Sequence, residues 1–158
     1  MWRRAFLSLL LMTLLCGQTA VYADQTEEIQ GADEIAAEQV ELFDTDKERV
    51  IQTYQNTTDF QQEAQSLLQS VSGRVMDLEP SLSHAMIVKI PLAPPQKLVH
   101  PQARIDAMIA SVFVIMPKER GHRPWMILHT KEEETLVVEC TGEVQKLRQL
   151  TKLREIPK

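Results

Sequence analysis

Hydrophobic and polar residues follow two different periods along the chain, and the change falls at Gly73. In residues 24–72, apolar residues recur at every seventh position against Glu, Gln, Asp and Ala, and no proline occurs. This spacing lines one side of a helix. After Gly73 come β-branched runs and all eight prolines, which predicts strands. The helical stripe consists of Ile29, Ala36, Phe43, Val50, Thr57, Ala64 and Val71, with Val40, Tyr54 and Leu68 beside it.

Two Thr-x-x-Glu/Gln sequences, at 45–48 and 58–61, divide this stripe. In such a capping box the two side chains satisfy each other's free amides, which marks the start of a helix. Glycine accepts the left-handed backbone of a helix end, so the helix is expected to stop at 72–73. We therefore expect an acidic helical arm over 24–57, with part of it disordered, and a helix over 58–72. A long coiled coil is the alternative, although Thr and Ala dilute its apolar seam.

The second half predicts an antiparallel sheet. Residues 85–92 alternate and give one apolar face, as a half-buried strand does. Residues 105–116 are apolar on both faces, which favours a central strand. Between them, residues 93–103 form a proline-rich connection. We interpret this connection as a stiff surface crossover, with a binding loop as the alternative.

Residues 125–130 and 135–140 flank a charged turn and predict the clearest hairpin of the chain. If the turn closes symmetrically, Trp125 pairs with Cys140. One core face would then carry Trp125, Ile127, His129, Leu136, Val138 and Cys140.

Residues 143–156 carry an aliphatic side chain at about every third position among basic residues. This suits a helix and leaves a further strand open. The order of elements predicts an α+β domain over 58–158, in which N-terminal helices pack on a curved antiparallel sheet of about four strands, with a C-terminal helix or extra strand. Over residues 58–141 this order resembles the rolls of cystatins and nuclear transport factors, a likeness of architecture that implies no activity.

The first 23 residues have the order of a signal peptide. Arg3 and Arg4 precede the apolar run 5–15, and small residues follow as far as Ala23. The apolar run is far shorter than the roughly 20 residues that cross a bilayer. We therefore expect cleavage after residue 23 and a periplasmic, cell-envelope or extracellular location, as for an exported bacterial protein. An uncleaved anchor is the alternative.

Two other export signals compete with general secretion. Residues 3–7 resemble a twin-arginine signal, but Trp2 and Ser8 depart from its usual flanks. Residues 14–16 resemble a lipoprotein signal, in which a small residue precedes the cysteine. Because Leu15 is not small, we do not expect a lipid anchor at Cys16.

Charge and cysteine content narrow the function classes. The whole chain carries a net charge of -5, and removal of Arg3 and Arg4 gives -5 - 2 = -7. An acidic chain of this kind is a poor nucleic-acid binder, because such binding depends on a basic surface. Cys140 is the single cysteine after residue 23, so no internal disulfide is expected. We interpret it as a small buried hydrophobe.

The chain lacks a recognisable catalytic or metal-binding motif. Its four histidines, at 84, 100, 122 and 129, do not have metal-ligand spacing. It has no glycine-rich phosphate loop and no Gly-x-Ser-x-Gly sequence. We assign no catalytic residue, cofactor or metal site, and an enzyme is the least favoured class.

The leading hypothesis is an exported binding protein without catalytic activity, whose partner is another envelope or extracellular macromolecule. A basic loop with Lys118, Arg120 and Arg123 is the candidate for binding that partner. The alternative is a carrier of a small hydrophobic ligand, with a pocket between helix and sheet. Its candidate lining residues are Phe113, Trp125, Ile127 and His129.

Overall fold

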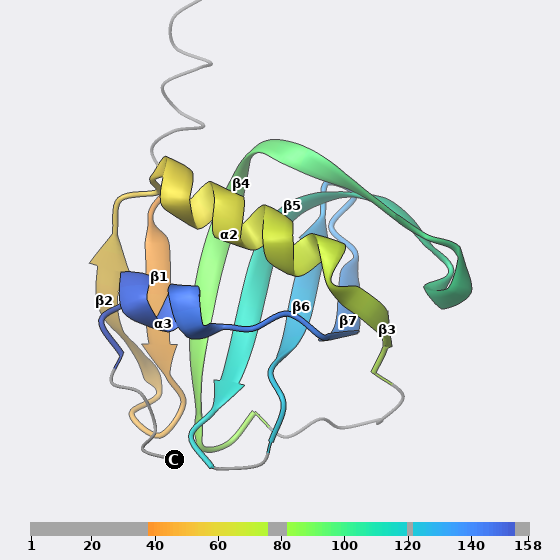
Figure 1. The fold of residues 1–158 in the computed structure, drawn as a ribbon. Coiled ribbons are helices and arrows are strands. Elements are labelled where there is room, and N and C mark those ends of the chain that lie inside the picture. The colour runs from red at the N-terminus through yellow and green to blue at the C-terminus, as the bar shows by residue number, and fades with distance from the viewer. Residues whose placement is uncertain (1–37, 76–81, 120–121, 154–158) are drawn as a thin grey trace, which may run out of the picture. The chain divides into compact units, whose positions relative to one another are not determined.

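The computed structural model describes residues 38–75, 82–119 and 122–153, all within the compact unit Glu34–Lys158. Seven antiparallel strands form one sheet in the order β2-β1-β4-β5-β6-β7-β3 (Figure 1). The strands are β1 (Val40–Asp44), β2 (Arg49–Tyr54), β3 (Val71–Arg74), β4 (Ala85–His100), β5 (Ile105–Pro117), β6 (Trp125–Thr130) and β7 (Thr135–Cys140). The helical elements are α2 (Thr58–Gln69), the 3-10 turn η1 (Pro101–Ala103) and α3 (Gln145–Leu150).

The predicted fold of N-terminal helices on about four strands is wrong, because the sheet has seven strands and its first two come from the expected helical arm. Phe43 and Val50 share a seven-residue spacing because they are cross-strand partners in the β1–β2 hairpin. The same spacing would place them on one side of a helix, so the pattern alone does not separate the two structures. Residues 45–48 form the hairpin turn, not a capping box.

The coiled-coil alternative is also wrong over residues 40–54, which form β1 and β2. The expected signal peptide and the possible lipidation site Cys16 lie outside the described residues, as does the first part of the acidic arm, residues 24–37.

The predicted helix over 58–72 is confirmed as α2, although it ends three residues early. The side chain of its N-cap residue, Thr57, makes no capping hydrogen bond. At the other end, Ser70 Oγ donates a hydrogen bond to the Leu67 carbonyl oxygen (2.7 Å), and residues 72–73 belong to β3. The helix buries one stripe against the sheet, as helical spacing requires. This stripe consists of Phe60, Glu63, Ala64, Leu67 and Leu68.

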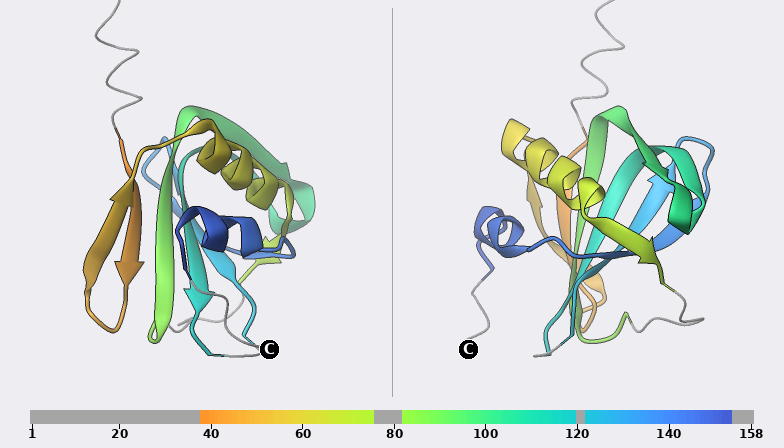
Figure 2. Two further views of the ribbon diagram at one scale, coloured as in Figure 1. Left: turned by 60° about the vertical axis from the view of Figure 1, so that its left-hand side comes forward. Right: turned by 45° about the vertical axis from the view of Figure 1, so that its right-hand side comes forward.

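The expected crossover at residues 93–103 is wrong, because β4 continues through Pro94 and Pro95. The ladder between β4 and β5 shifts register between Pro91 and Gln96. Such a bulge tolerates proline, since the ladder hydrogen bonds are interrupted there. Beyond the bulge, residues 96–109 form the β4–β5 arm, which curves over the helix side of the sheet (Figure 2).

The β4–β5 arm ends beside the β3 edge of the sheet. Arg74 of β3 donates a hydrogen bond from Nε to the Ala103 carbonyl oxygen (2.9 Å) and another from Nη2 to that of Arg104 (3.3 Å). At the opposite edge, each residue of β2 from Arg49 to Thr53 is exposed. The two edge strands therefore differ in how far the rest of the fold covers them.

The predicted strands at 105–116, 125–130 and 135–140 are confirmed, and β5 takes the central place in the sheet. The predicted register of the hairpin is wrong by one residue, because Trp125 pairs with Glu139 and not with Cys140. The turn closes asymmetrically: Thr130 N donates to the Glu134 carbonyl oxygen, and Glu133 has a left-handed backbone. A shift of one residue moves every side chain of a strand to the other face.

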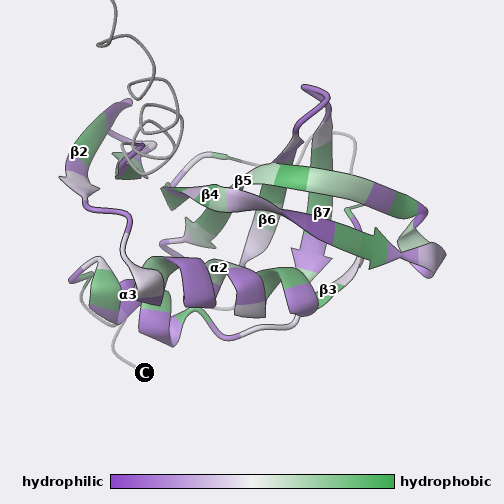
Figure 3. Ribbon diagram, turned by 90° about the horizontal axis from the view of Figure 1, so that it is seen from above, coloured by the Kyte–Doolittle hydropathy of each residue, from purple (hydrophilic) through white to green (hydrophobic). Residues whose placement is uncertain are grey.

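The inner face of the sheet carries the core. One row of cross-strand neighbours crosses five strands there, and each member is at most 2% exposed. The two described helices, α2 and α3, lie on this side of the sheet, as Figures 1 and 3 show. The row consists of Leu42, Val88, Val114, Met126 and Val138.

Of the two possibilities for residues 143–156, the helix is confirmed over 145–150 as α3. Leu147 is buried in the core, and Tyr54 Oη donates a hydrogen bond to the Thr151 carbonyl oxygen just after the helix (2.8 Å). This bond ties the end of α3 to the edge strand β2. The helices in the described part of the chain are too short or too polar to cross a membrane.

Candidate binding surface

The face of the sheet opposite the helices, here called the outer face, carries an unbroken row of apolar side chains. Cross-strand pairing joins Val50 to Phe43, Phe43 to Ile87, Ile87 to Ile115, and Ile115 to Trp125. The row therefore runs over five adjacent strands, from the edge strand β2 to β6. No described helix covers it.

A second row lies next to the first on the outer face. Its members, in strand order from β1 to β7, are Glu41, Lys89, Phe113, Ile127 and Val137. His129 lies one pair further along β6, opposite Ser111, and its ring centroid is 4.7 Å from that of Phe113.

The four residues expected to line a carrier pocket thus lie together on the same face of the sheet. Phe113, Trp125 and Ile127 are half-buried and His129 is exposed. The face is the one away from the helices, because the true register of the β6–β7 hairpin turns Trp125, Ile127 and His129 outward. These residues form a surface and do not line a pocket between helix and sheet.

This composition is unusual for a sheet face that meets water. Antiparallel sheets with one solvated face normally alternate apolar and polar residues. Here Phe113, Ile127 and Val137 are neighbours on β5, β6 and β7, and all three are half-buried. We call these three residues with Trp125 the aromatic patch. A contiguous, partly exposed apolar patch is typical of an interaction site.

A cavity of about 530 Å³ adjoins the aromatic patch at one end of the sheet. Trp125 belongs to both features, and Arg123 also lines the cavity. The cavity is bordered by the ends of β3, β6 and β7 and by two loops. The described residues that line it are Ser72, Val75, Ser83, His84, Pro117, Glu119, His122, Arg123, Pro124, Trp125, Glu139, Cys140 and Thr141.

Cys140 is buried, as predicted. Its Sγ donates a hydrogen bond to the Pro124 carbonyl oxygen (3.5 Å). Burial raises the pKa of the thiol, so its reactive thiolate form is disfavoured. The cavity therefore offers a packing surface at Cys140 and not a nucleophile.

The three residues of the expected basic loop do not act together. Lys118 Nζ donates to Asp44 Oδ1 (2.5 Å) and to Asp46 Oδ2 (2.6 Å), so its charge is already paired. Arg120 lies outside the described residues. Arg123 is exposed and makes no ion pair with another described residue.

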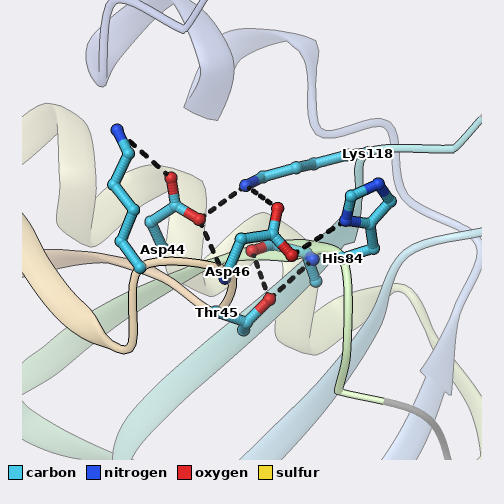
Figure 4. A network of polar contacts seen from close by, with 7 residues as sticks. Asp44, Thr45, Asp46, His84 and Lys118 are labelled. Carbon is cyan, nitrogen blue, oxygen red and sulfur yellow. Dashed lines mark hydrogen bonds and ion pairs between the residues drawn. The ribbon is translucent and has the colours of Figure 1, made fainter.

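The Lys118 contacts belong to a polar network at the end of the sheet, drawn in Figure 4. His84 Nδ1 lies 2.8 Å from Asp46 Oδ1, and Thr45 Oγ1 both donates to the Ala85 carbonyl oxygen (3.0 Å) and accepts from the Ala85 amide (2.8 Å). These bonds join the β1–β2 turn to the start of β4 and the end of β5.

The opposite charges in the network stabilise one another. The hydrogen bond from Lys118 lowers the pKa of Asp44, and the hydrogen bonds with His84 and Lys118 lower that of Asp46. The bond to Asp46 raises the pKa of His84. Burial lowers the pKa of Lys118, but its bonds to both carboxylates outweigh this and raise it. Carboxylates with lowered pKa values stay ionised and suit structure better than proton transfer.

The histidines are dispersed over the fold. His84 and His122 line the cavity, His129 lies on the outer face, and His100 Nδ1 accepts a hydrogen bond from the Ala103 amide (3.0 Å). Among the described residues, no group of three or more His, Cys, Asp and Glu side chains is arranged to hold a metal ion.

A smaller cavity, of about 300 Å³, lies between α2 and β4. Its lining includes Leu68 of α2 and Leu98 of β4. Phe113, Trp125, Ile127 and His129 are absent from its described lining. The residues proposed for a carrier and the space between helix and sheet are thus in different places.

Sequence reasoning missed Phe43, Val50 and Ile87 as surface residues. Phe43 and Val50 were counted in a helical stripe, and Ile87 was not assigned to a binding surface. The available signal was the turn between Phe43 and Val50, since a hairpin explains their spacing as well as a helix does. Comparison with models of protein families, with curated proteins and with solved structures finds no match to this chain.

Proposed function

We propose that this chain is an exported binding protein without catalytic activity, and that it holds another protein on the aromatic patch. One observation carries the proposal: Phe113, Ile127 and Val137 are cross-strand neighbours beside Trp125, on a face that no described helix covers. Aromatic side chains such as Trp125 and Phe113 are enriched in protein interfaces, and a few buried anchors supply most of the binding energy there.

The chemistry of the patch favours a polypeptide partner over nucleic acid. Of the basic residues expected to bind a partner, Lys118 is committed to Asp44 and Asp46, whereas Arg123 is exposed at the border of the patch. A single guanidinium suits one carboxylate on the rim of an interface. The partner we propose presents apolar side chains to the patch and an acidic side chain to Arg123.

Export is the second part of the proposal, and it is supported by the opening residues alone. Arg3 and Arg4, the short apolar run 5–15 and the small residue Ala23 follow the order that signal peptidase requires. The proposed location is periplasmic, cell-envelope or extracellular. Mass spectrometry of the N-terminal peptide, in protein isolated from its host, tests this part directly, because cleavage after residue 23 would make Asp24 the first residue.

Site-specific photo-crosslinking in the native host tests the binding part. A photoreactive residue is placed at Ile127 on the aromatic patch and, in a matched control, at the exposed Gln62 on α2. We expect one protein to be captured from position 127 but not from position 62. Trp125→Ala and Arg123→Ala should each weaken that capture while leaving the thermal unfolding midpoint nearly unchanged. Equal capture from both positions, or capture indifferent to Trp125→Ala, rejects the proposal.

A carrier of small hydrophobic ligands is the second candidate, and the cavity beside Trp125 is the observation that favours it. Its volume of about 530 Å³ falls within the range of about 300 to 1,000 Å³ found for small-molecule sites. In a Trp2→Phe chain, Trp125 is the only tryptophan and reports on the cavity. A fluorescence change with fatty acids or other apolar metabolites supports a carrier, and no change with any of them rejects it.

A further inference from the structure

We infer that the other half of the outer face, formed by β2, β1 and β4, binds a second copy of this chain face to face. This half is distinct from the aromatic patch. It contains Val50, Phe43 and Ile87 of the apolar row and the charged pair Glu41 and Lys89 of the next row.

The apolar part of this surface is accessible to a partner. Val50 is 43% exposed on the edge strand, and Phe43 and Ile87 are half-buried. In each case the side chain belongs to the face that no described helix covers. Two such sheets stack about 10 Å apart, with their apolar side chains between them.

The charges of this surface complement those of its own copy. Glu41 and Lys89 are cross-strand neighbours of opposite sign, and neither makes an ion pair with another described residue. A two-fold axis that lies between the two sheets, parallel to the strands and midway between β1 and β4, places each Glu41 opposite the Lys89 of the other copy. Two ion pairs then form from one residue pair.

The same axis also matches the apolar row to itself. Phe43 of one copy lies opposite Ile87 of the other, because these two cross-strand neighbours are equally distant from the axis. A contact of this kind uses the same patch on both chains, which is the requirement for a closed dimer. The opposite charges cancel within the patch, so two acidic chains can approach there with little repulsion.

Three of the four residues of the aromatic patch, Trp125, Ile127 and Val137, stay available in this arrangement, whereas Phe113 of β5 lies opposite the partner's edge strand β2. Trp125 and Ile127 lie on β6, which is further from the axis than the partner's edge strand β2 reaches. The dimer would therefore present these three residues twice. The inference does not rest on the proposed function, and either can fail while the other holds.

Charge exchange followed by mixing tests the inference. In sedimentation equilibrium of the purified protein, we expect a concentration-dependent dimer, and both Glu41→Lys and Lys89→Glu should raise its dissociation constant by about tenfold or more. An equal mixture of these two variants should recover the dimer, since each new lysine then meets a new glutamate. The double variant should also recover it. Thermal unfolding of each single variant shows whether its fold is retained.

Recovery on mixing cannot come from folding, because the cross-strand repulsion within each single variant is unchanged by the other chain. Phe43→Ala should weaken the dimer, and Trp125→Ala should leave it intact. A protein that is monomeric at every concentration overturns the inference. A dimer whose dissociation constant is unchanged in both charge variants also overturns it, as does an equal mixture of the two variants that dimerises no more tightly than either variant alone. Loss of partner capture with Trp125→Ala is read separately and bears on the proposed function alone.

Discussion

Asp46 Oδ1 lies 2.8 Å from His84 Nδ1, so a carboxylate of the β1–β2 turn holds an imidazole at the start of β4. The contact raises the pKa of His84 above its ordinary value of 6.5. Folding therefore strengthens proton binding at this residue, and the resulting stability is complete below pH 6.5. It is lost as the pH rises through the raised pKa. We expect the urea midpoint to fall over that interval.

The matched variant for this prediction is His84→Asn. His84 has a left-handed backbone (φ 56°), which asparagine tolerates, and an amide does not titrate. The fall in the urea midpoint above pH 6.5 should be smaller in this variant. Asp46→Asn should in turn lower the pKa of His84 measured by NMR. An unchanged pKa of His84 would show that the contact is absent in solution.

Lys118 should stabilise the fold more than Lys47, although both approach Asp44. The Asp44 side chain is 7% exposed and lies 2.5 Å from Lys118 Nζ but 3.6 Å from Lys47 Nζ. Lys118→Met removes the nearer cation, and that cation also binds Asp46. We expect a lower thermal midpoint for Lys118→Met than for Lys47→Met. Equal midpoints would mean that the shorter contact of Lys118 with Asp44 and its contact with Asp46 in Figure 4 add no stability beyond that of Lys47.

Neighbouring positions on β6 should respond very differently to truncation. Leu128 is fully buried on the inner face, whereas Ile127 is half-buried on the outer face. Leu128→Ala should cost about 2 to 5 kcal/mol of unfolding free energy, since it leaves a cavity in the core. Ile127→Ala should cost less than about 1 kcal/mol. A larger loss of unfolding free energy for Ile127→Ala than for Leu128→Ala would instead favour the symmetric register predicted from the sequence, in which Ile127 belongs to the core face.

The two described glycines offer a comparison of backbone crowding. A Cβ at position 142 would lie 2.6 Å from Ser70 Oγ and 3.2 Å from Leu67 Cδ2, whereas a Cβ at position 73 has no neighbour within 4 Å. Gly142→Ala should destabilise the protein by about 1 to 3 kcal/mol through overpacking. Gly73→Ala should be close to neutral. Similar denaturant midpoints for both variants would contradict this packing at the end of α2.

Local sequence patterns were sufficient for elements that bury a face of regular period. The hairpin of β6 and β7, the central strand β5 and the helix α2 were all predicted from such patterns. The β1–β2 hairpin was not, because a seven-residue spacing fits both a helix face and a cross-strand pair, as at Phe43 and Val50. What decides between them is the pairing of β1 with β4, a contact between distant parts of the chain.

For the candidate surface, too, local sequence predicted some features, whereas others depended on contacts that it does not determine. Residue type singled out Phe113, Trp125, Ile127 and His129, and they do lie on one face. The choice of face depended on how the turn after Thr130 closes, and a single-residue difference in register reversed it. The role of Lys118 could not be predicted, because its two carboxylate partners, Asp44 at the end of β1 and Asp46 in the turn that follows, lie more than 70 positions earlier in the chain.

The unequal edges of the sheet also limit how this protein could aggregate. Chains that join strand to strand need an open edge on each side of every molecule before they can grow into a fibre. Here β2 is open along its length, whereas β3 is short and lies beside the η1 turn to which Arg74 is bonded. Backbone pairing along β2 would therefore use up the open edges of both molecules and stop at two.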